Sequence, residues 1–255
     1  MNKNLLKRIV LTSAIAVLGV STSFAALVME RDQSVDTAPS VGMYRFEVPV
    51  ELQGTYNSAG VANLTASMEK EPNTLSMNVA HVKGNPSESY VVEIYKDLAA
   101  IETHRKSDHY QAFVNEVGSK LTNRKMYDVQ SVLLFEKKDA LSIVNDGKAV
   151  VTLTEFTVDS NEIDTVQRQY QLDMERAVRD DVGYKAGYVL RERNAKNRWY
   201  IIQIYSNQEA LTKHLNSPGY RFMMSQIQGS LQGVTTKVLD EDILVNHGGQ
   251  AFVRP

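Results

Sequence analysis

The chain has 255 residues, of which 43% are hydrophobic and 23% charged, which is enough for a sizeable core in one or two domains. A formal net charge of −2, without a basic tract that carries interleaved aromatics, argues against a nucleic-acid partner. Because the sequence contains no cysteine, it excludes disulfides, thiolate nucleophiles, cysteine-ligated metals and a lipidated cysteine after a leader.

The segment 1–25 has the three parts of a secretory signal peptide: a basic start, an apolar run from Ile9 to Val20, and small side chains that favour cleavage after Ala25. An uncleaved membrane anchor is the alternative, but the apolar run is shorter than the roughly 20 residues that span a bilayer. No later segment is apolar enough to span. We therefore expect a periplasmic or secreted protein that has no stable membrane insertion after signal cleavage.

Residues 26–42 mix charged residues with Ser, Thr, Pro and Gly without a sustained period, which predicts a flexible lead-in. The globular part is expected to begin near Met43. A strand with a buried face is predicted first, because apolar residues alternate at Tyr44, Phe46, Val48 and Val50. A helix is predicted next, with a stripe formed by Val61, Leu64 and Met68.

The sequence then repeats itself. The segment Tyr90–Tyr95 returns in closely similar form as Tyr200–Tyr205. Without a gap, the spacing that separates Tyr90 from Tyr200 also matches further pairs of identical residues, among them Ala100 and Ala210, His104 and His214, Ser107 and Ser217, and Tyr110 and Tyr220. The repeat therefore covers a whole domain.

Each copy is predicted as strand, helix, strand, strand, two short helices and strand. The first copy is placed at residues 43–138 and the second at 150–246. Between them, residues 139–149 are predicted as a short linker, because they contain the turn signal Asn145-Asp146-Gly147. Residues 247–255 are predicted as a loose tail.

This order of elements is ferredoxin-like, with helices on one face of an antiparallel sheet and the other face in need of cover. We expect an α+β protein in which two tandem ferredoxin-like units cover each other and form an intrachain pseudo-dimeric α+β barrel. Further oligomerisation stays open, since fusion of the two copies already satisfies the need for a dimer.

The segment from Tyr90 to Phe113 resembles the antibiotic biosynthesis monooxygenase family, whose members carry an aromatic-ended strand, an Ala-containing helix, then His, Ser, His and an aromatic. In this chain the pattern reads Glu93-Ile94-Tyr95, Ala99-Ala100, His104, Ser107, Asp108-His109-Tyr110 and Phe113. The second copy keeps His214 and Ser217 but departs at Gly219, which stands where the first copy has His109.

The resemblance implies a dimeric α+β barrel. It also implies oxidation of electron-rich phenols or quinols by O₂ without a metal or flavin, so that the partners would be a small aromatic molecule and O₂, with no cofactor. Such a substrate needs a mostly apolar pocket and a base, since a deprotonated phenol can itself pass an electron to oxygen.

His104 is the leading candidate for that base, because imidazole accepts a proton near neutral pH. Its repetition as His214 also suits a structural role, in which each imidazole bonds a backbone carbonyl and holds the corner between the two short helices. His109 is a second catalytic candidate, with an exposed histidine at a helix start as the alternative. Their spacing in the sequence does not stack His104 and His109 on one helical face, so no metal site is predicted.

Substrate-binding candidates are the aromatic residues of the two copies and the second repeated histidine. For the strand-ending tyrosines the alternative is a plug of the barrel, and for the helical aromatics it is ordinary core. The full set is Tyr95, Tyr110, Phe113, Tyr205, His214, Tyr220 and Phe222.

Taken together, these features predict an exported, cofactor-independent monooxygenase that acts on a small quinol- or anthrone-type aromatic. Two alternatives are a non-catalytic small-ligand-binding or stress protein on the same barrel, and a haem-binding or haem-degrading protein in which a pocket histidine ligates the iron.

Overall fold

The structure is a computed structural model that describes residues 38–255, so the predicted signal peptide and most of the predicted lead-in lie outside the described residues. Within residues 38–255, no helix combines the length and the apolar character needed to cross a membrane. The predicted export therefore stays a prediction.

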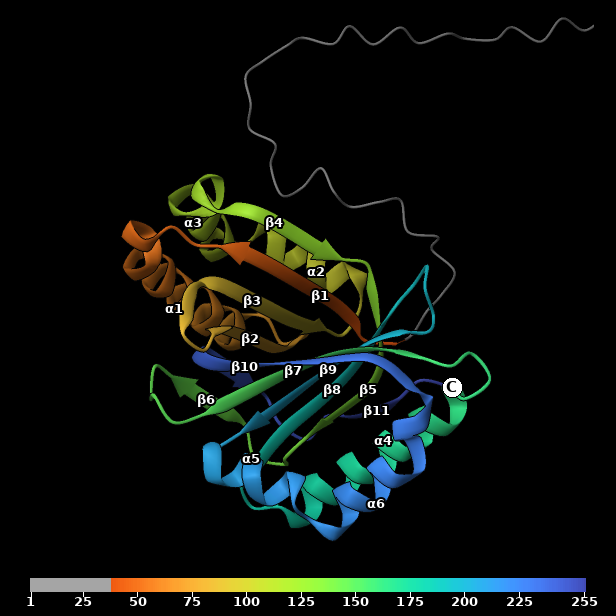
Figure 1. The fold of residues 1–255 in the computed structure, drawn as a ribbon. Helices are drawn as coiled ribbons and strands as arrows, with labels where there is room; N and C mark the ends of the chain where they lie inside the picture. Colours follow the sequence, from red (N-terminus) through yellow and green to blue (C-terminus); the bar gives the residue numbers. More distant parts are fainter. Residues whose placement is uncertain (1–37) are drawn as a thin grey trace, which may run out of the picture. The chain divides into compact units, whose positions relative to one another are not determined.

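The first repeat contains, in chain order, β1 (Ser40–Glu47), η2 (Val50–Leu52), α1 (Gln53–Lys70), β2 (Thr74–Val82), β3 (Asn85–Tyr95), α2 (Leu98–Lys106), α3 (Asp108–Glu116), η3 (Gly118–Lys120), β4 (Thr122–Tyr127) and β5 (Val129–Glu136) (Figure 1). The second repeat contains β7 (Val150–Val158), α4 (Ile163–Asp180), β8 (Tyr184–Glu192), β9 (Arg198–Tyr205), α5 (Gln208–Leu215), α6 (Pro218–Ile227), η4 (Gln228–Ser230) and β10 (Leu231–Asn246). Helices α1 and α4 begin and end at equivalent positions of the two repeats, and so do strands β2 and β8. The two copies therefore share one topology.

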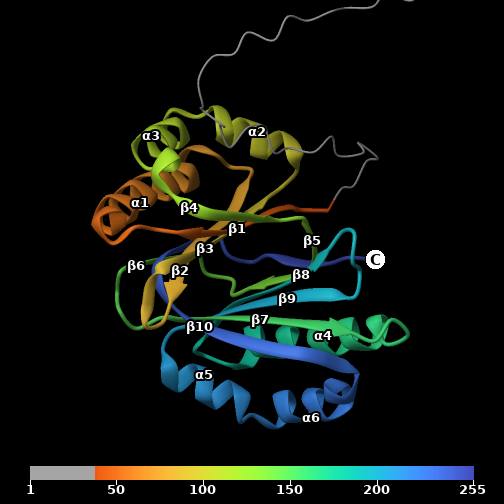
Figure 2. The ribbon, with the colours of Figure 1, turned by 45° about the horizontal axis from the view of Figure 1, so that its top comes forward.

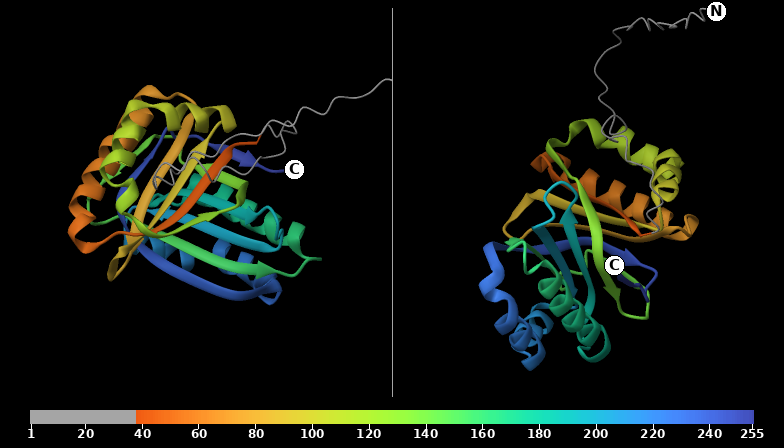
Figure 3. Two further views of the ribbon diagram at one scale, coloured as in Figure 1. Left: turned by 90° about the horizontal axis from the view of Figure 1, so that it is seen from above. Right: turned by 90° about the vertical axis from the view of Figure 1, so that its right-hand side faces the viewer.

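The strands form a single antiparallel sheet in the order β11-β5-β8-β9-β7-β10-β2-β3-β1-β4, with β6 (Leu141–Val144) beside β10. Helices α1 to α3 cover the outer side of the first repeat's strands, and α4 to α6 cover the outer side of the second repeat's strands (Figures 2 and 3). The α+β fold with two ferredoxin-like units is thus confirmed.

The last strand of each repeat crosses into the other repeat. In the first copy β4 pairs with β1, but β5, which follows directly after Asp128, pairs with β8 of the second copy. In the second copy the first half of β10 pairs with β7 and its second half pairs with β2 of the first copy. Each repeat therefore completes the sheet of the other, whereas the sequence predicted only that two bare sheet faces meet.

The inner faces of the two repeats share one apolar core. From β1, Val41 and Met43 point into it, while Phe46 is buried on the helix side, so both faces of the strand are covered. Other residues of this shared core are Tyr90, Val92, Ile94, Val151, Leu153, Tyr188, Leu190, Tyr200, Ile202 and Ile204. Val50, predicted on the buried face, is 74% exposed because the strand ends at Glu47 and Val50 begins η2.

Both segments that flank the second repeat contribute strands. Strand β6 lies within the predicted linker, and β11 (Ala251–Val253) lies within the predicted tail, where it pairs with β5. Gly248 and Gly249, both with positive φ, turn the chain so that the Gly249 amide donates to the carbonyl of Lys137 at 2.7 Å. The tail is therefore held to the sheet and is not loose.

Candidate functional site

The two short helices of the first repeat meet at a sharp corner. The Ser107 hydroxyl accepts a hydrogen bond from the Tyr110 amide at 3.3 Å and donates one to the His104 carbonyl at 2.7 Å. Ser107 therefore ends α2 and caps α3, and the chain changes direction between them. His104 in the last turn of α2 and His109 in the first turn of α3 come together across this corner.

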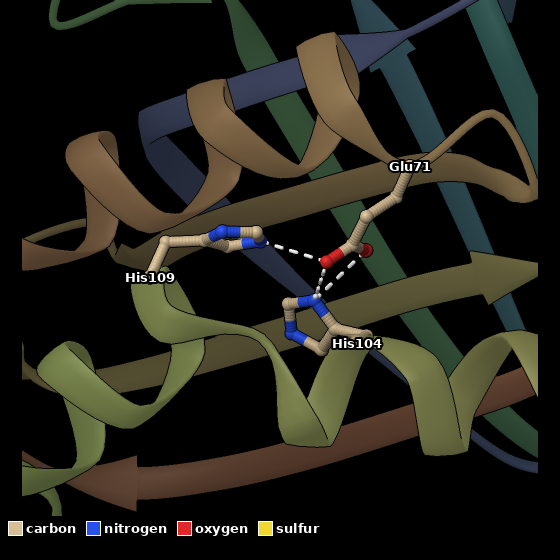
Figure 4. A group of neighbouring side chains, drawn as sticks. All are labelled: Glu71, His104 and His109. Atoms are coloured by element: carbon tan, nitrogen blue, oxygen red, sulfur yellow. Dashed lines mark hydrogen bonds and ion pairs between the residues drawn. The ribbon is translucent and has the colours of Figure 1, made fainter.

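One carboxylate, Glu71 at the end of α1, holds both histidines (Figure 4). Nδ1 of His104 lies 3.1 Å from Glu71 Oε2, and Nε2 of His109 lies 2.7 Å from Oε1. The Thr74 hydroxyl also donates to Oε2 at 2.7 Å. Two stretches that are far apart in the sequence, one with Glu71 and Thr74 and one with both histidines, are thus joined at one charged group.

The environment keeps Glu71 ionised. Burial of its side chain, which is 7% exposed, raises the pKa, but the hydrogen bonds with His104, Thr74 and His109 together lower it to about 2. At neutral pH Glu71 is an anion, and it favours the imidazole tautomer that carries the proton on the nitrogen facing it.

The second ring nitrogen of His104 points away from Glu71. This Nε2 atom is buried and has no hydrogen-bond partner among the described residues. Tyr110 and Tyr95 pack against the ring, with centroids 4.8 Å and 5.7 Å from that of the imidazole. His104 therefore has one nitrogen fixed by a carboxylate and the other free among aromatic side chains.

Glu93 and Tyr95 extend this polar group along β3. The Tyr95 hydroxyl donates to Glu93 Oε2 at 3.0 Å. Burial raises the pKa of Glu93, and the charge of His104 and the bond from Tyr95 only partly offset that effect. Burial, followed by the charge of Glu93, raises the pKa of Tyr95 well above its usual value, so Tyr95 stays a neutral donor.

In the second repeat the same corner is built with different groups. Nδ1 of His214 lies 2.9 Å from Asp181 Oδ2, which repeats the bond between His104 and Glu71. However, Nε2 of His214 lies 3.4 Å from Oδ2 of Asp173, an ion-pair distance, and Asp173 stands where the first repeat has Asn63. Both nitrogens of His214 thus face carboxylates.

An arginine takes the place of the missing histidine. Arg176 contacts Asp181 at 3.0 Å and Asp173 at 2.9 Å, so its guanidinium bridges the two carboxylates. A Cβ atom on Gly219 would overlap the Arg176 side chain. Gly219 therefore leaves the space that Arg176 fills, and the second repeat replaces an imidazole with a permanent cation.

The structure gathers most of the predicted residues into two equivalent clusters. Tyr95, His104, His109 and Tyr110 lie together in the first repeat. The rings of Tyr205, His214 and Tyr220 lie together in the second repeat. Two candidates lie elsewhere: Phe113 packs against Tyr56, with ring centroids 6.1 Å apart, and Phe222 is 63% exposed.

The structural roles expected for His104 and His109 differ from those in the structure in their bonding partners and exposure. The corner is held, but His104 bonds a carboxylate and not a backbone carbonyl. His109 begins a helix as expected, yet its side chain is only 13% exposed and is bonded to Glu71. His104 and His109 lie on different helices because the chain turns at Ser107, so their spacing, which would separate them on one helix, does not keep them apart.

Sequence reasoning missed Glu71 and Glu93. Glu71 had a signal in the repeat, because the alignment that pairs His104 with His214 also places acidic Asp181 opposite Glu71. Glu93 lies inside the repeated strand and is aligned with Gln203 of the second copy. The titratable group at this position is therefore present in the first copy alone. Glu71, His104 and His109 also each offer one metal-ligating atom, and these three atoms lie within 4.8 Å of one another.

Comparison with known proteins agrees with this picture. The family model described as antibiotic biosynthesis monooxygenase matches residues 41–116 and 149–225, once in each repeat. No curated protein matches the chain.

Among solved structures, a monooxygenase-like protein from Lactobacillus acidophilus NCFM is similar at 20% identity, with 84% of this chain and 99% of that chain covered and a TM-score of 0.78. A second, from Fusobacterium nucleatum subsp. nucleatum ATCC 25586, is 19% identical, with 86% and 100% covered and a TM-score of 0.76. An anthrone oxidase-like protein is 11% identical, with 87% and 98% covered and a TM-score of 0.52. At these sequence identities, the structural similarity shows that this chain and the three proteins share a fold.

Proposed function

The chain belongs to the antibiotic biosynthesis monooxygenase family, and from that premise we propose that it is an exported monooxygenase that oxidises a small quinol- or anthrone-type aromatic with O₂ in its first repeat. The anthrone oxidase-like protein that shares the two-repeat fold supports this choice of substrate class. For an anthrone, the reaction converts one CH₂ group to a ketone. One oxygen atom of O₂ enters the product, and the other leaves as water with the two hydrogens.

The pairing of Glu71 with His104 is the observation that carries the proposal. Glu71 accepts the hydrogen bond from Nδ1, so the lone pair resides on Nε2, which is buried, has no partner among the described residues and lies in the aromatic cluster. A carboxylate that orients an imidazole in this way also stabilises the imidazolium formed when the base takes a proton. His104 removes the proton from the phenol or from the acidic CH₂ group, and the resulting anion transfers an electron to O₂.

The second repeat provides the contrast. The nitrogen of His214 that corresponds to the free nitrogen of His104 faces Asp173 at 3.4 Å, and Arg176 neutralises the carboxylates around it. Nε2 of His214 also has no hydrogen-bond partner among the described residues, but, unlike Nε2 of His104, it lies beside the buried carboxylate of Asp173. We assign turnover to the first repeat, and a structural role to the corner of the second.

Oxygen consumption by the chain without its predicted signal peptide, with a panel of hydroquinones and anthrones, tests the proposal. His104→Ala should reduce kcat by about 100-fold or more, since general-base catalysis contributes on that order. His214→Ala is the matched control and should retain turnover, provided that circular dichroism shows both variants folded.

Three results would contradict the proposal. Full turnover by His104→Ala would remove the proposed base. Equal losses in both variants would point to a structural role for the repeated histidine. Saturable binding of the aromatic without oxygen uptake by the folded protein would favour the alternative of a non-catalytic binding protein, which the altered corner of the second repeat makes the next candidate.

Export is the remaining part of the proposal and rests on the signal-like segment 1–25. Amino-terminal sequencing of the protein recovered from the extracytoplasmic fraction should begin at Ala26. Full-length protein that stays in the cytoplasm would overturn it.

A further inference from the structure

We propose that Glu71, His104 and His109 form a reversible binding site for one divalent transition-metal ion in the first repeat, and that the bound ion withdraws His104 from catalysis. The metal site itself goes beyond the proposed function and does not depend on it. Its inhibitory effect rests on the proposed role of His104 as the base.

The geometry of the three side chains is close to that of a ligand set. Ligands that surround an ion at about 2.0–2.2 Å lie about 3 Å from one another. Nδ1 of His104 lies 3.1 Å and 3.3 Å from the two oxygens of Glu71, and Nε2 of His109 lies 2.7 Å from Oε1. All three ligating atoms are within 4.8 Å of one another, so a small closing movement of the two imidazoles would let them share one ion.

The surroundings also fit a metal site. The Thr74 hydroxyl donates to Glu71 Oε2 at 2.7 Å and so fixes the plane of the carboxylate, as outer groups usually do for ligating carboxylates. His104 is 1% exposed and Glu71 7%, whereas His109 is 13% exposed. The site is therefore rigid on its inner side, and solvent reaches it along His109.

The chemistry of the donors indicates the class of ion. Two imidazoles and one carboxylate bind Zn²⁺ and its first-row neighbours such as Co²⁺ and Ni²⁺, and they leave positions for water. Because the chain has no cysteine, thiolate-preferring ions have no soft ligand here. Three protein ligands with open positions favour an exchangeable ion over a permanent structural one.

The second repeat shows that the corner does not require this set of donors. There the carboxylate Asp181 is held by His214 and by Arg176, whose guanidinium has no lone pair for a metal and repels one by its charge. Gly219 supplies no ligand. The group that steadies the carboxylate can thus be an arginine. Among the described residues, three ligating side-chain atoms lie within 4.8 Å of one another at the first corner and not at the second. One site per chain is expected.

Metal binding at this place has a consequence for the base. The ion takes the lone pair of Nδ1 in His104, so the imidazole proton moves to Nε2. In that state Nε2 donates a hydrogen bond and cannot accept a proton from a substrate. Occupancy therefore abolishes the general base without displacing any helix.

Isothermal titration of Zn²⁺ into the chelator-treated chain, together with the visible absorption of added Co²⁺, tests the site. We expect saturable binding of one ion per chain. His109→Gly, which gives the first repeat the residue that the second repeat has at Gly219, should weaken the affinity at least about tenfold, in the range seen for disturbed metal shells. His81→Ala is the matched control, because His81 also pairs with one carboxylate, Asp242 at 2.9 Å, outside the cluster, and this variant should bind like the parent.

Each result of the titrations either supports the metal site or overturns it. Absence of saturable binding, or unchanged affinity in His109→Gly, would overturn the site. Equal weakening in His81→Ala would show that binding is unspecific. Because these readouts need no turnover, they hold whether or not the chain proves to be an oxygenase. If turnover is measurable, it should fall in proportion to Zn²⁺ occupancy, and turnover that persists at full occupancy would overturn the inhibitory part alone.

Discussion

Glu136, the last residue of β5, is a buried acid that contacts Tyr188 of the shared core. The Tyr188 hydroxyl donates to its Oε1 at 2.8 Å, and that hydroxyl also contacts the Ser76 hydroxyl at 3.0 Å. Burial raises the pKa of Glu136 to about 7, although the bonds from Tyr188 and the Gln250 backbone lower it in part. The position equivalent to Glu136 in the second repeat is the uncharged Asn246, so this acid has no counterpart there.

This residue gives the fold a dependence on pH. The folded-state pKa lies above the ordinary value of 4.5, so the folded state holds the proton more tightly than the unfolded state. The contribution of Glu136 to stability is complete below about pH 4.5 and is lost as the pH rises to about 7, at a cost on the order of 3 kcal/mol.

Glu136→Gln should remove that loss, because the amide keeps an acceptor for Tyr188 without a charge. Urea unfolding at about pH 5 and about pH 8 would measure it. The variant should gain free energy of unfolding relative to the parent at the higher pH. A difference between the two proteins that is the same at both pH values would contradict the assignment.

At the scale of residues, the sequence predicted that His104 and His214 occupy equivalent positions, but it did not predict what they touch. The internal repeat singled out His104 and His214. Glu71 lies in a different element, at the end of α1, and no local sequence pattern predicts its contact with His104. The repeat marks this position as acidic in both copies, but the contact itself follows only from the packing of α1, α2 and α3.

At the scale of elements, the corner of the second repeat depends on the absence of a side chain. Gly219 lies in the first turn of α6, where a Cβ atom would overlap Arg176. Arg176 in turn neutralises Asp173 and Asp181, and Asp173 is fully buried. Displacing the guanidinium would leave buried negative charge without its partner.

Gly219→Ala should therefore destabilise the protein by about 1–3 kcal/mol, the usual cost of overpacking, although alanine is intrinsically the better helix former. Gly229→Ala is the control, because a Cβ atom there meets nothing within 4 Å. Chemical denaturation of the two variants would measure the difference. Equal stabilities would show that Arg176 can move aside without cost.

Helices and strands were predicted well where burial follows a simple period, and less well where polar groups are buried. In α1, Leu64 is buried as predicted, but Val61 and Met68 are only half-buried. The buried face instead includes polar Asn63 and Ser67, because that face adjoins the His104 corner. A hydrophobic stripe cannot reveal a helix face that is turned toward a polar site.

At the scale of the whole molecule, the exchanged strands make the two repeats one folding unit. Leu133 belongs to the first repeat by sequence, yet in β5 it packs in the core beneath α4, with Val166 and Trp199 of the second repeat. Strand β10 makes the reciprocal connection to β2. Neither repeat can unfold without exposing part of the core of the other.

Calorimetry should therefore show one cooperative transition, with equal calorimetric and van't Hoff enthalpies. Leu133→Ala should cost about 2–5 kcal/mol and should lower the Tm of that single transition. Two resolved transitions, with only one shifted by the substitution, would show that the repeats fold independently.

The exchange itself could not be predicted from the sequence. The buried run Val129–Phe135 reads as one strand that continues from Thr122–Tyr127, and its composition does not say which neighbour each half takes. Partner choice in a sheet depends on long-range register. The repeat predicted the number and order of the elements, whereas the crossing followed from how the two copies fit together.

Joining both copies in one polypeptide also removes a constraint that symmetric dimers carry. In a homodimer every substitution appears at both equivalent positions, so a change that ruins one site ruins its twin. Here the arginine and glycine of the second corner have no counterpart in the first. In the fused chain each repeat accumulates its own substitutions. One repeat can therefore keep a catalytic site while the other keeps a structural role.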